Sequence, residues 1–418
     1  MKRCLVILLV IAAATAEAAQ RRRAAPPADP SLPAVWVWNN AHVLQSTAWP
    51  APAADLEPLR EIVGEAQVVG LGDGTHGTRE FYTTKLRIID FLVREMGFDV
   101  VAFEAPFPLF DRLNEYVRTG VGDPRTLLIE GDERLFYRFW RVEEMLDVVE
   151  WMRAYNVERG ENAVEIAGTD VYDGEGAAAA VVKYLFTVDA DLASTAQADY
   201  ACVQSFHPLN GCLERALGVR ETLAGRRGHL EAISGRNAFE EALQNARIAE
   251  QSQMSIIDRD PNMAANTRWL LDQRSESKRI IYWAHQEHVG KTGSPWVAGG
   301  LSAGWHLARD LGPRYVAIGS LTGGGTVRHW TPPAGISYLS NVPAPAAGSY
   351  ESYFRLRPAA AILIPLHRSL PSWLLGPAPC FGTGTAPSGE DHRLSVPLPA
   401  KLDAVLYVDQ TTPTTPLQ

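Results

Sequence analysis

Four short apolar segments of the chain each end in a group of reactive side chains. Apolar runs of this length, closed by glycine or polar residues, are typical of strands buried on both faces of a parallel sheet. Such strands share one carboxyl edge, where ligands bind, so the four endings predict one pocket. They are Val68–Leu71 followed by Asp73 and His76, Val100–Phe103 followed by Glu104, Val164–Ala167 followed by Asp170, and Ile280–Trp283 followed by His285 and His288.

The segment between the first two strands predicts a helix, because its apolar residues recur at a spacing close to 3.6. Gly97 follows the last of them and is suited to end the helix in a left-handed conformation. A strand, a helix and a strand over about 40 residues form a right-handed crossover unit. The crossover brings His76 and Glu104 to the same edge of the sheet. The apolar helix positions are Phe81, Leu86, Ile89, Leu92, Val93 and Met96.

The rest of the pattern completes an α/β fold with a mostly parallel sheet, flanking helices and a helical insertion or cap. Residues 111–156 and 177–185 have helical patterns, and no strand pattern occurs from about 192 to 274. We therefore predict a helical insertion at about 190–275. The Pro- and Gly-rich stretch 370–388 is predicted to be a long loop. Later strands are expected at Arg279–Trp283, Tyr315–Ser320, Ala359–Ile364 and Ala404–Val408.

The first 34 residues have the pattern of a targeting segment and a linker. Lys2 and Arg3 precede an apolar run, Leu5–Thr15, and Ala16-Glu17-Ala18 fits a small-x-small cleavage site. This predicts a signal peptide at 1–18 and a disordered linker at 19–34, followed by one folded domain at 35–418. The protein is therefore expected to be secreted or periplasmic, with no membrane span after cleavage.

The composition of the chain narrows the classes of molecule that it can bind. The chain of 418 residues is 46% hydrophobic and 21% charged, which is ordinary for a globular protein. A formal net charge of −9 argues against nucleic acid as a partner, because that needs a basic surface. Cys202 and Cys212 are close enough to form a disulfide, which would leave Cys380 unpaired, and the spacing alone does not decide this pairing. The oligomeric state has no signal in the sequence.

His76 is the leading candidate for catalysis. It lies in a Gly-Thr-His-Gly turn, whose glycines let the backbone turn sharply and bring a ligand close. A neutral imidazole can deprotonate water, and a carboxylate beside it fixes its tautomer and stabilises the imidazolium. Asp73 and Glu104 are the candidate carboxylates. On the first helix, Lys85 is expected to face the pocket.

Each of the other candidate site residues fits more than one role. His285 and His288 are three residues apart and share a face if the segment is helical. They are candidates either to donate hydrogen bonds to an oxyanion or, with His76 and Glu104, to bind a divalent metal. Asp170 is either a carboxylate that holds a histidine ring or a plain turn residue. Arg79 begins the first helix and is, like Lys85 and Asp170, a candidate for substrate binding or support.

The same segments resemble a known family. GDGTHG followed by a helix and VVAFEAP, VEIAGTD, IIYWAHQEH and LDAVLYVDQ resemble the erythromycin esterase family, from about Val37 to Leu417. The family includes hydrolases that open macrolide lactones and members linked to polysaccharide biosynthesis. The resemblance implies that His76 activates water, that Glu104 is the family's essential strand-end glutamate and that His285 and His288 are its second histidine pair.

Two positions depart from the family pattern. Asp73 stands where the family usually has Glu, and Gln286 stands in place of a frequent Asn. Aspartate is one methylene shorter, so its carboxylate is drawn back by roughly an ångström if the backbone is unchanged. Asp73 is therefore the position that decides how far macrolide hydrolysis carries over.

Together, the residues and the resemblance predict a secreted esterase. In the predicted reaction His76 activates a water that attacks the carbonyl of a small-molecule ester or lactone, macrolide-like in the family, where hydrolysis confers antibiotic resistance. No cofactor is required for this reaction. Two alternatives stay open. One is a divalent-metal hydrolase or transferase acting on a saccharide or phosphoester, and the other is a non-catalytic envelope binding protein.

Overall fold

The computed structural model describes most of the chain after the N-terminal segment. It describes residues 32–130, 138–160, 163–204, 209–273, 278–295, 297–331, 336–367, 370–381 and 393–418. The predicted signal peptide at 1–18 and the linker up to residue 31 lie outside the described residues. None of the described helices is long and apolar enough to cross a membrane.

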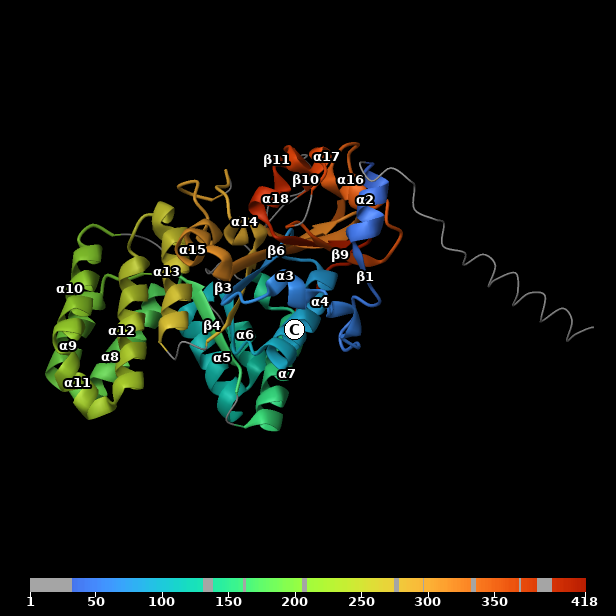
Figure 1. The fold of residues 1–418 in the computed structure, drawn as a ribbon. Coiled ribbons are helices and arrows are strands. Elements are labelled where there is room, and N and C mark those ends of the chain that lie inside the picture. Colours follow the sequence, from blue (N-terminus) through green and yellow to red (C-terminus); the bar gives the residue numbers. More distant parts are fainter. Residues whose placement is uncertain are drawn as a thin grey trace, which may run out of the picture.

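An eight-stranded sheet organises the described chain, in the order β1-β9-β12-β6-β2-β5-β3-β4 (Figure 1). The six strands from β12 to β4 run parallel, and β9 and β1 are added antiparallel at one edge. This confirms the predicted α/β class with a mostly parallel sheet. The strands are β1 (His42–Leu44), β2 (Val68–Asp73), β3 (Val100–Pro106), β4 (Glu165–Asp170), β5 (Ile280–His285), β6 (Tyr315–Thr322), β9 (Ala361–Pro365) and β12 (Ala404–Val408).

Helices cover both faces of the sheet, because its central strands are apolar on both sides. Every residue of β2, β3 and β5 is buried. Along β2, Val69 and Leu71 belong to one apolar core and Val68 to the other, as the two-residue period of a strand requires. One core contains α4 (Arg79–Met96), α5 (Phe107–Thr119) and α7 (Glu143–Arg159), and the other contains α2 (Pro33–Asn40), α13 (Arg259–Asp272), α15 (Ala303–Leu311) and α16 (Tyr350–Phe354).

The helix α4 begins and ends as its pattern predicts. Its apolar residues face the sheet, and Gly97 follows with φ of 71° in the left-handed region. The chain then enters β3 after a short connection. The first crossover therefore places the ends of β2 and β3 at one edge, with β5 between them.

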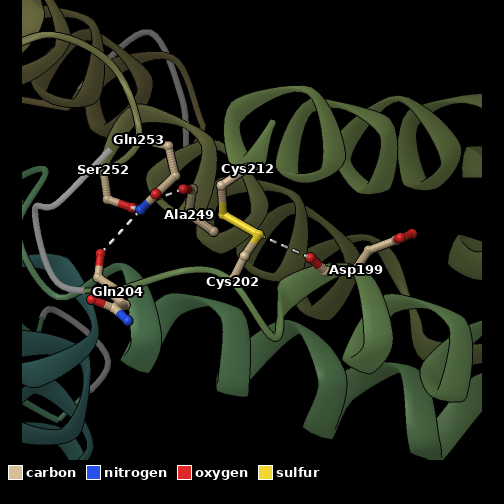
Figure 2. Close-up of a disulfide and its surroundings, with 7 residues drawn as sticks. All are labelled: Asp199, Cys202, Gln204, Cys212, Ala249, Ser252 and Gln253. Carbon is tan, nitrogen blue, oxygen red and sulfur yellow. Dashed lines mark hydrogen bonds between the residues drawn. A yellow bond between two sulfur atoms is a disulfide. The ribbon is translucent and has the colours of Figure 1, made fainter. Parts of the chain in front are cut away.

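A group of helices extends beyond the β4 edge of the sheet (Figure 1). Residues of α8, α9, α10, α11 and α12 form an apolar core of their own, and α13 then returns to the sheet. A disulfide joins Cys202 to Cys212 with 5.7 Å between the Cα atoms, and nearby Gln253 donates to the Gln204 carbonyl (Figure 2). The helices are α8 (Gly174–Val188), α9 (Ala190–Tyr200), α10 (Cys212–Gly225), α11 (Arg227–Ser234) and α12 (Arg236–Gln251).

Two small antiparallel sheets lie in segments where the sequence pattern indicated no strand. β7 (Gly325–Thr331) and β8 (Ile336–Val342) form a hairpin directly after β6. β10 (Ala378–Phe381) pairs with β11 (Arg393–Val396), so the predicted loop at 370–388 contains a strand, and α17 (Ser372–Leu375) precedes it. Short strands rich in glycine, proline or serine lack the apolar run or clean alternation that identifies a strand from sequence.

The C-terminus of the chain lies beside α4 and near α7 (Figure 1). The Arg79 amide donates to the Thr412 carbonyl at 2.9 Å, and the Thr414 amide donates to the Gly77 carbonyl at 3.1 Å. The Leu417 amide donates to the Arg141 carbonyl at 3.0 Å. The C-terminal segment thus ties the start of α4 to the start of α7, beside the His76 turn.

Candidate active site

The four strand endings lie in a row at one edge of the sheet. β2, β5, β3 and β4 are consecutive neighbours, and Asp73 is paired in register with His285. Asp170 at the end of β4 lies opposite Pro106 at the end of β3. The parallel order therefore brings together Asp73, His285, Glu104 and Asp170, which are up to 212 positions apart in the chain.

Close backbone packing holds the turn that carries His76. A Cβ atom on Gly77 would lie 1.9 Å from the Arg328 carbonyl oxygen, so only glycine fits there. The His76 ring is 4% exposed and stacks on Phe139, with 4.0 Å between centroids and 8° between planes. Its centroid is 5.0 Å from that of His285. The imidazole thus packs against an aromatic ring and lies close to a second imidazole.

Asp73 stands behind His76 and is itself firmly held. One carboxylate oxygen accepts from the Lys85 ammonium, and the other accepts from Trp283 Nε1 at 3.0 Å. Burial favours the neutral acid, but Lys85 and His76 hold the pKa of Asp73 below its ordinary value. His76 Nδ1 lies 3.6 Å from Asp73 Oδ2, which is longer than a hydrogen bond.

Glu104 contacts the second histidine pair. Its Oε2 accepts from the backbone N–H of His285 at 2.8 Å, and its Oε1 accepts from Arg259 at 2.9 Å. Its Oε1 also lies 3.4 Å from His288 Nε2. Burial opposes ionisation, but His288, Arg259 and His76 together hold the pKa of Glu104 well below its usual range. The carboxylate next to the His76 ring is therefore Asp73, and Glu104 positions His285.

The helix α13 supplies two residues of the site that the sequence did not reveal. Arg259 donates to Asp170 through Nε at 3.0 Å and also through Nη2, so Asp170 holds an arginine rather than a histidine ring. Asp260 accepts from His288 Nδ1 at 2.7 Å and from the Ala303 amide at 2.8 Å. An Arg-Asp pair at the start of a helix follows no strand pattern, and only the packing of α13 beside β4 reveals its role.

His285 is held in a defined neutral tautomer. Burial, together with the positive charge that His76 carries when it is protonated, lowers the pKa of His285 to about 3, so the ring is neutral near pH 7. Its Nδ1 accepts from the Glu287 amide at 3.3 Å. The single ring proton must therefore be on Nε2, which is buried and has no hydrogen-bond partner in the described part of the chain. His285 thus presents an unused N–H donor 5.0 Å, ring to ring, from His76.

His288 has the opposite electrostatic state. Burial lowers its pKa, but Asp260 and Glu104 outweigh burial and raise that pKa to about 9. Arg259 Nη1 lies 3.2 Å from His288 Nε2, a distance that would also suit donation to a neutral ring. Two carboxylates within 3.4 Å favour the imidazolium over that arrangement. His288 and Arg259 therefore form a cationic pair bound by Glu104, Asp170 and Asp260.

The remaining candidates divide into two groups. Lys85 is fully buried, donates to Asp73 and to the Leu71 carbonyl, and lies over the Trp283 ring. Burial lowers the pKa of Lys85 to about 8 against the opposing field of Asp73. Arg79 does not join this cluster, because its side chain is 57% exposed and lies 3.6 Å from Glu144. Glu287 points away from the two histidines that flank it and pairs with Lys401 and Ser294.

The arrangement does not fit a divalent metal. Across the described residues, no group of three or more His, Cys, Asp or Glu side chains is placed to hold an ion. Glu104 is occupied by Arg259, His288 and a backbone amide, and His288 donates through Nδ1 to Asp260. A dication at this place would have to displace a guanidinium and deprotonate an imidazolium, both of which cost free energy.

Comparison with known proteins identifies relatives of the chain. The family model described as erythromycin esterase matches residues 93–411. The Bacillus subtilis (strain 168) protein YbfO, provisionally named a hydrolase, is 23% identical over 90% of this chain and 91% of its own length. Erythromycin esterase type II of Escherichia coli is 23% identical over 63% of this chain and 71% of its own.

A solved structure has the same fold. A Bacillus cereus protein aligns with a TM-score of 0.82 and 25% identity over 94% of this chain and all of its own. The family and the names of the relatives indicate a hydrolase. The matched residues 93–411 span most of the described chain, including Glu104, Arg259, His285 and His288. The chain therefore belongs to the erythromycin esterase family.

Proposed function

We propose that the protein hydrolyses a carboxylic ester or lactone, with His76 as the general base and His285 as the oxyanion donor. The observation that carries the proposal is the buried pair of imidazoles 5.0 Å apart. One of them lies beside the carboxylate of Asp73, and the other presents an Nε2–H without a partner in the described chain. A base and a preorganised donor facing one place are what acyl transfer to water requires.

The proposed reaction proceeds in two steps. The oxygen of a water attacks the carbonyl carbon while its proton passes to Nε2 of His76, because Nδ1 faces Asp73. Asp73 stabilises the imidazolium, and the oxyanion accepts a hydrogen bond from His285 Nε2–H. When the intermediate collapses, the bond between carbonyl carbon and alkoxide oxygen breaks, and His76 returns the proton to the leaving alcohol.

The charged cluster around Glu104 positions His285 rather than reacting. Glu104 accepts from the His285 amide, and Arg259 and His288 hold Glu104 from the other side. The cluster joins β3, β4 and β5 to α13. Because a displacement of about 1 Å costs roughly 100-fold in rate, this frame is expected to matter as much as the reacting groups.

The substrate and the compartment are part of the proposal. The family name and the name of the Escherichia coli relative favour a macrolide lactone, with antibiotic resistance as its consequence. The disulfide between Cys202 and Cys212 supports a secreted or periplasmic protein, because disulfides persist in oxidising compartments. This compartment fits the predicted signal peptide at 1–18.

The test is a hydrolysis screen of the mature protein with erythromycin and with chromogenic esters. We expect turnover by the wild type and a loss of about 10²- to 10⁴-fold in His76→Ala, the usual contribution of a general base. Near-UV circular dichroism should stay unchanged in that variant. His229→Ala, on the exposed face of α11, is the matched control and should keep full activity. Unchanged turnover in His76→Ala contradicts the mechanism.

The same screen separates the metal alternative and the binding alternative. We expect the rate to survive exhaustive chelation, because the charged cluster is satisfied by Arg259 and His288. Activity that disappears with chelator and returns with a divalent metal would replace the proposed mechanism. Binding of erythromycin without turnover would instead identify a binding protein.

A further inference from the structure

The hairpin of β7 and β8 lies directly against the turn that carries His76. The Arg328 amide donates to the Gly77 carbonyl at 3.1 Å, and the Arg328 carbonyl approaches Gly77 so closely that no Cβ atom fits between them. His76 and His329 are the chain neighbours of these two residues. The hairpin therefore lies beside His76, the proposed base, although the proposed mechanism uses none of the hairpin's side chains.

His329 is buried without any use of its polar atoms. Its ring is 0% exposed, and neither ring nitrogen has a hydrogen-bond partner in the described chain. Burial, together with the positive charge that His76 carries when it is protonated, lowers the pKa of His329 to about 4, so the ring is neutral near pH 7. A buried polar atom that is left unpaired has lost its hydrogen bonds to water without replacement, which makes such a ring uncommon unless a ligand or water completes it.

Two hydroxyl groups share the face of His329. Tyr338 lies directly opposite His329 in the hairpin, and Ser340 lies opposite Val327, so all four side chains are on one face. The Tyr338 and Ser340 hydroxyl oxygens are buried and have no hydrogen-bond partner in the described chain. None of the described side chains on this face carries a charge. Each polar group is a neutral donor and acceptor, which suits a hydroxyl better than a carboxylate or phosphate.

We propose that His329, Tyr338 and Ser340 form a binding face for a neutral, hydroxyl-bearing part of the substrate. This inference rests on the proposed function, because it concerns the substrate of the same site. The hairpin would hold the hydroxylated portion while His76 acts on the ester carbonyl. His329 is then a specificity-determining residue and takes no proton during the reaction.

The kinetic test compares p-nitrophenyl hexanoate with p-nitrophenyl 6-hydroxyhexanoate, which differ by one hydroxyl group. We expect the wild type to favour the hydroxylated ester through a lower KM. His329→Phe should raise KM for that ester, relative to KM for the hexanoate in the same variant, by about 2- to 10-fold, the worth of one neutral hydrogen bond. His329→Gln, which keeps a donor and an acceptor, should recover part of the preference.

A binding test does not depend on hydrolysis. In histidine-labelled wild type, we expect millimolar methyl α-D-glucopyranoside to shift the ¹⁵N resonances of His329, assigned by their loss in His329→Phe, and methoxycyclohexane not to shift them. Tyr338→Phe and Ser340→Ala should weaken the shift. Asn341→Ala, on the exposed opposite face of β8, is the matched control and should bind as the wild type does.

The outcomes separate the two proposals. If neither probe shifts His329, or both shift it equally, the binding face is overturned even when esters are cleaved. A preference that survives in His329→Phe also overturns it and leaves His329 as a packing residue. If the sugar shifts His329 but no ester is cleaved, the binding face stands and the proposed hydrolase fails.

Discussion

At the scale of single residues, the site depends on three histidines kept in two different charge states. His285 and His329 are neutral because burial and His76 oppose their protonation, whereas His288 is charged because Asp260 and Glu104 lie beside it. A neutral imidazole can donate to an oxyanion without giving up its proton, and an imidazolium can bind a carboxylate. The proposed roles of these residues therefore follow from their neighbours rather than from their residue type.

The charge state of His288 has a consequence for stability. An unfolded histidine has a pKa of about 6.5, and the folded value is about 9. A raised pKa stabilises the fold fully below pH 6.5, and this contribution is lost as pH rises from 6.5 through 9. We expect the excess unfolding free energy of the wild type over His288→Gln to shrink across this range, by up to roughly 3 kcal/mol.

The measurement is urea unfolding of both proteins between pH 6 and pH 9.5. Lys85, with a pKa of about 8, titrates in the same range but is present in both proteins, so its contribution cancels in the difference. A difference that does not change with pH would show that His288 is neutral and accepts from Arg259.

At the scale of elements, the contact between the His76 turn and the β7–β8 hairpin sets the geometry of the base. The turn has no helix or strand of its own and depends on backbone contacts with Arg328 and Thr414. A turn fixed in this way moves when the backbones are forced apart. Catalysis should therefore be more sensitive than stability to a small side chain placed at this contact.

Gly77→Ala tests this contact. The added methyl group would overlap the Arg328 carbonyl, so the turn and the hairpin must separate. We expect kcat to fall by about 100-fold or more, because His76 is displaced from Asp73 and His285, while far-UV circular dichroism is unchanged. Gly218→Ala is the control, since a Cβ there has no atom within 4 Å. Full activity in Gly77→Ala would show that the turn is not held by the hairpin.

At the scale of the whole molecule, the C-terminal end of the described chain is joined to the segments near residues 77 and 142, beside the site. The C-terminal segment after β12 contacts Gly77, Arg79 and Arg141, and Thr415 bonds to Glu144 of α7. The proposed site therefore takes its shape from residues near 76, near 142 and near 414. Loss of the last residues should disturb the site although none of them touches the reacting atoms in the mechanism.

Deletion of residues 411–418 tests this connection. The deletion removes the hydrogen bonds to Gly77, Arg79, Arg141 and Glu144 and leaves β12 complete. We expect a melting temperature lower by several degrees and a larger fractional loss of activity than of folded protein, measured by calorimetry and by ester hydrolysis at 25 °C. Thr415→Ala, which keeps the backbone contacts, should have a smaller effect. An active, equally stable truncated protein would contradict this role.

The sequence by itself determined the sheet and the edge where the site lies. Apolar runs indicate buried strands, and polar residues directly after them indicate the carboxyl ends of those strands. The sequence could therefore place at this edge of the sheet the residues Asp73, Glu104, Asp170, His285 and His288. The β7–β8 hairpin could not be predicted. Gly323 to Gly325 follow β6, and the alternation of apolar and polar residues in the two strands of the hairpin is too weak to indicate strands. The disulfide was compatible with the spacing, and the structure forms it.

Only the tertiary structure decided which side chains pair. Arg259 and Asp260 come from a helix about 90 positions after Asp170 in the chain, and His329 comes from a hairpin more than 250 positions after His76. A pattern along the chain indicates whether a side chain is buried, but not which residue, distant in the sequence, it contacts. These tertiary contacts decide the charge of His288, the tautomer of His285 and the position of Glu104 beside His285. The reason is that Coulomb and hydrogen-bond energies act through space over a few ångströms.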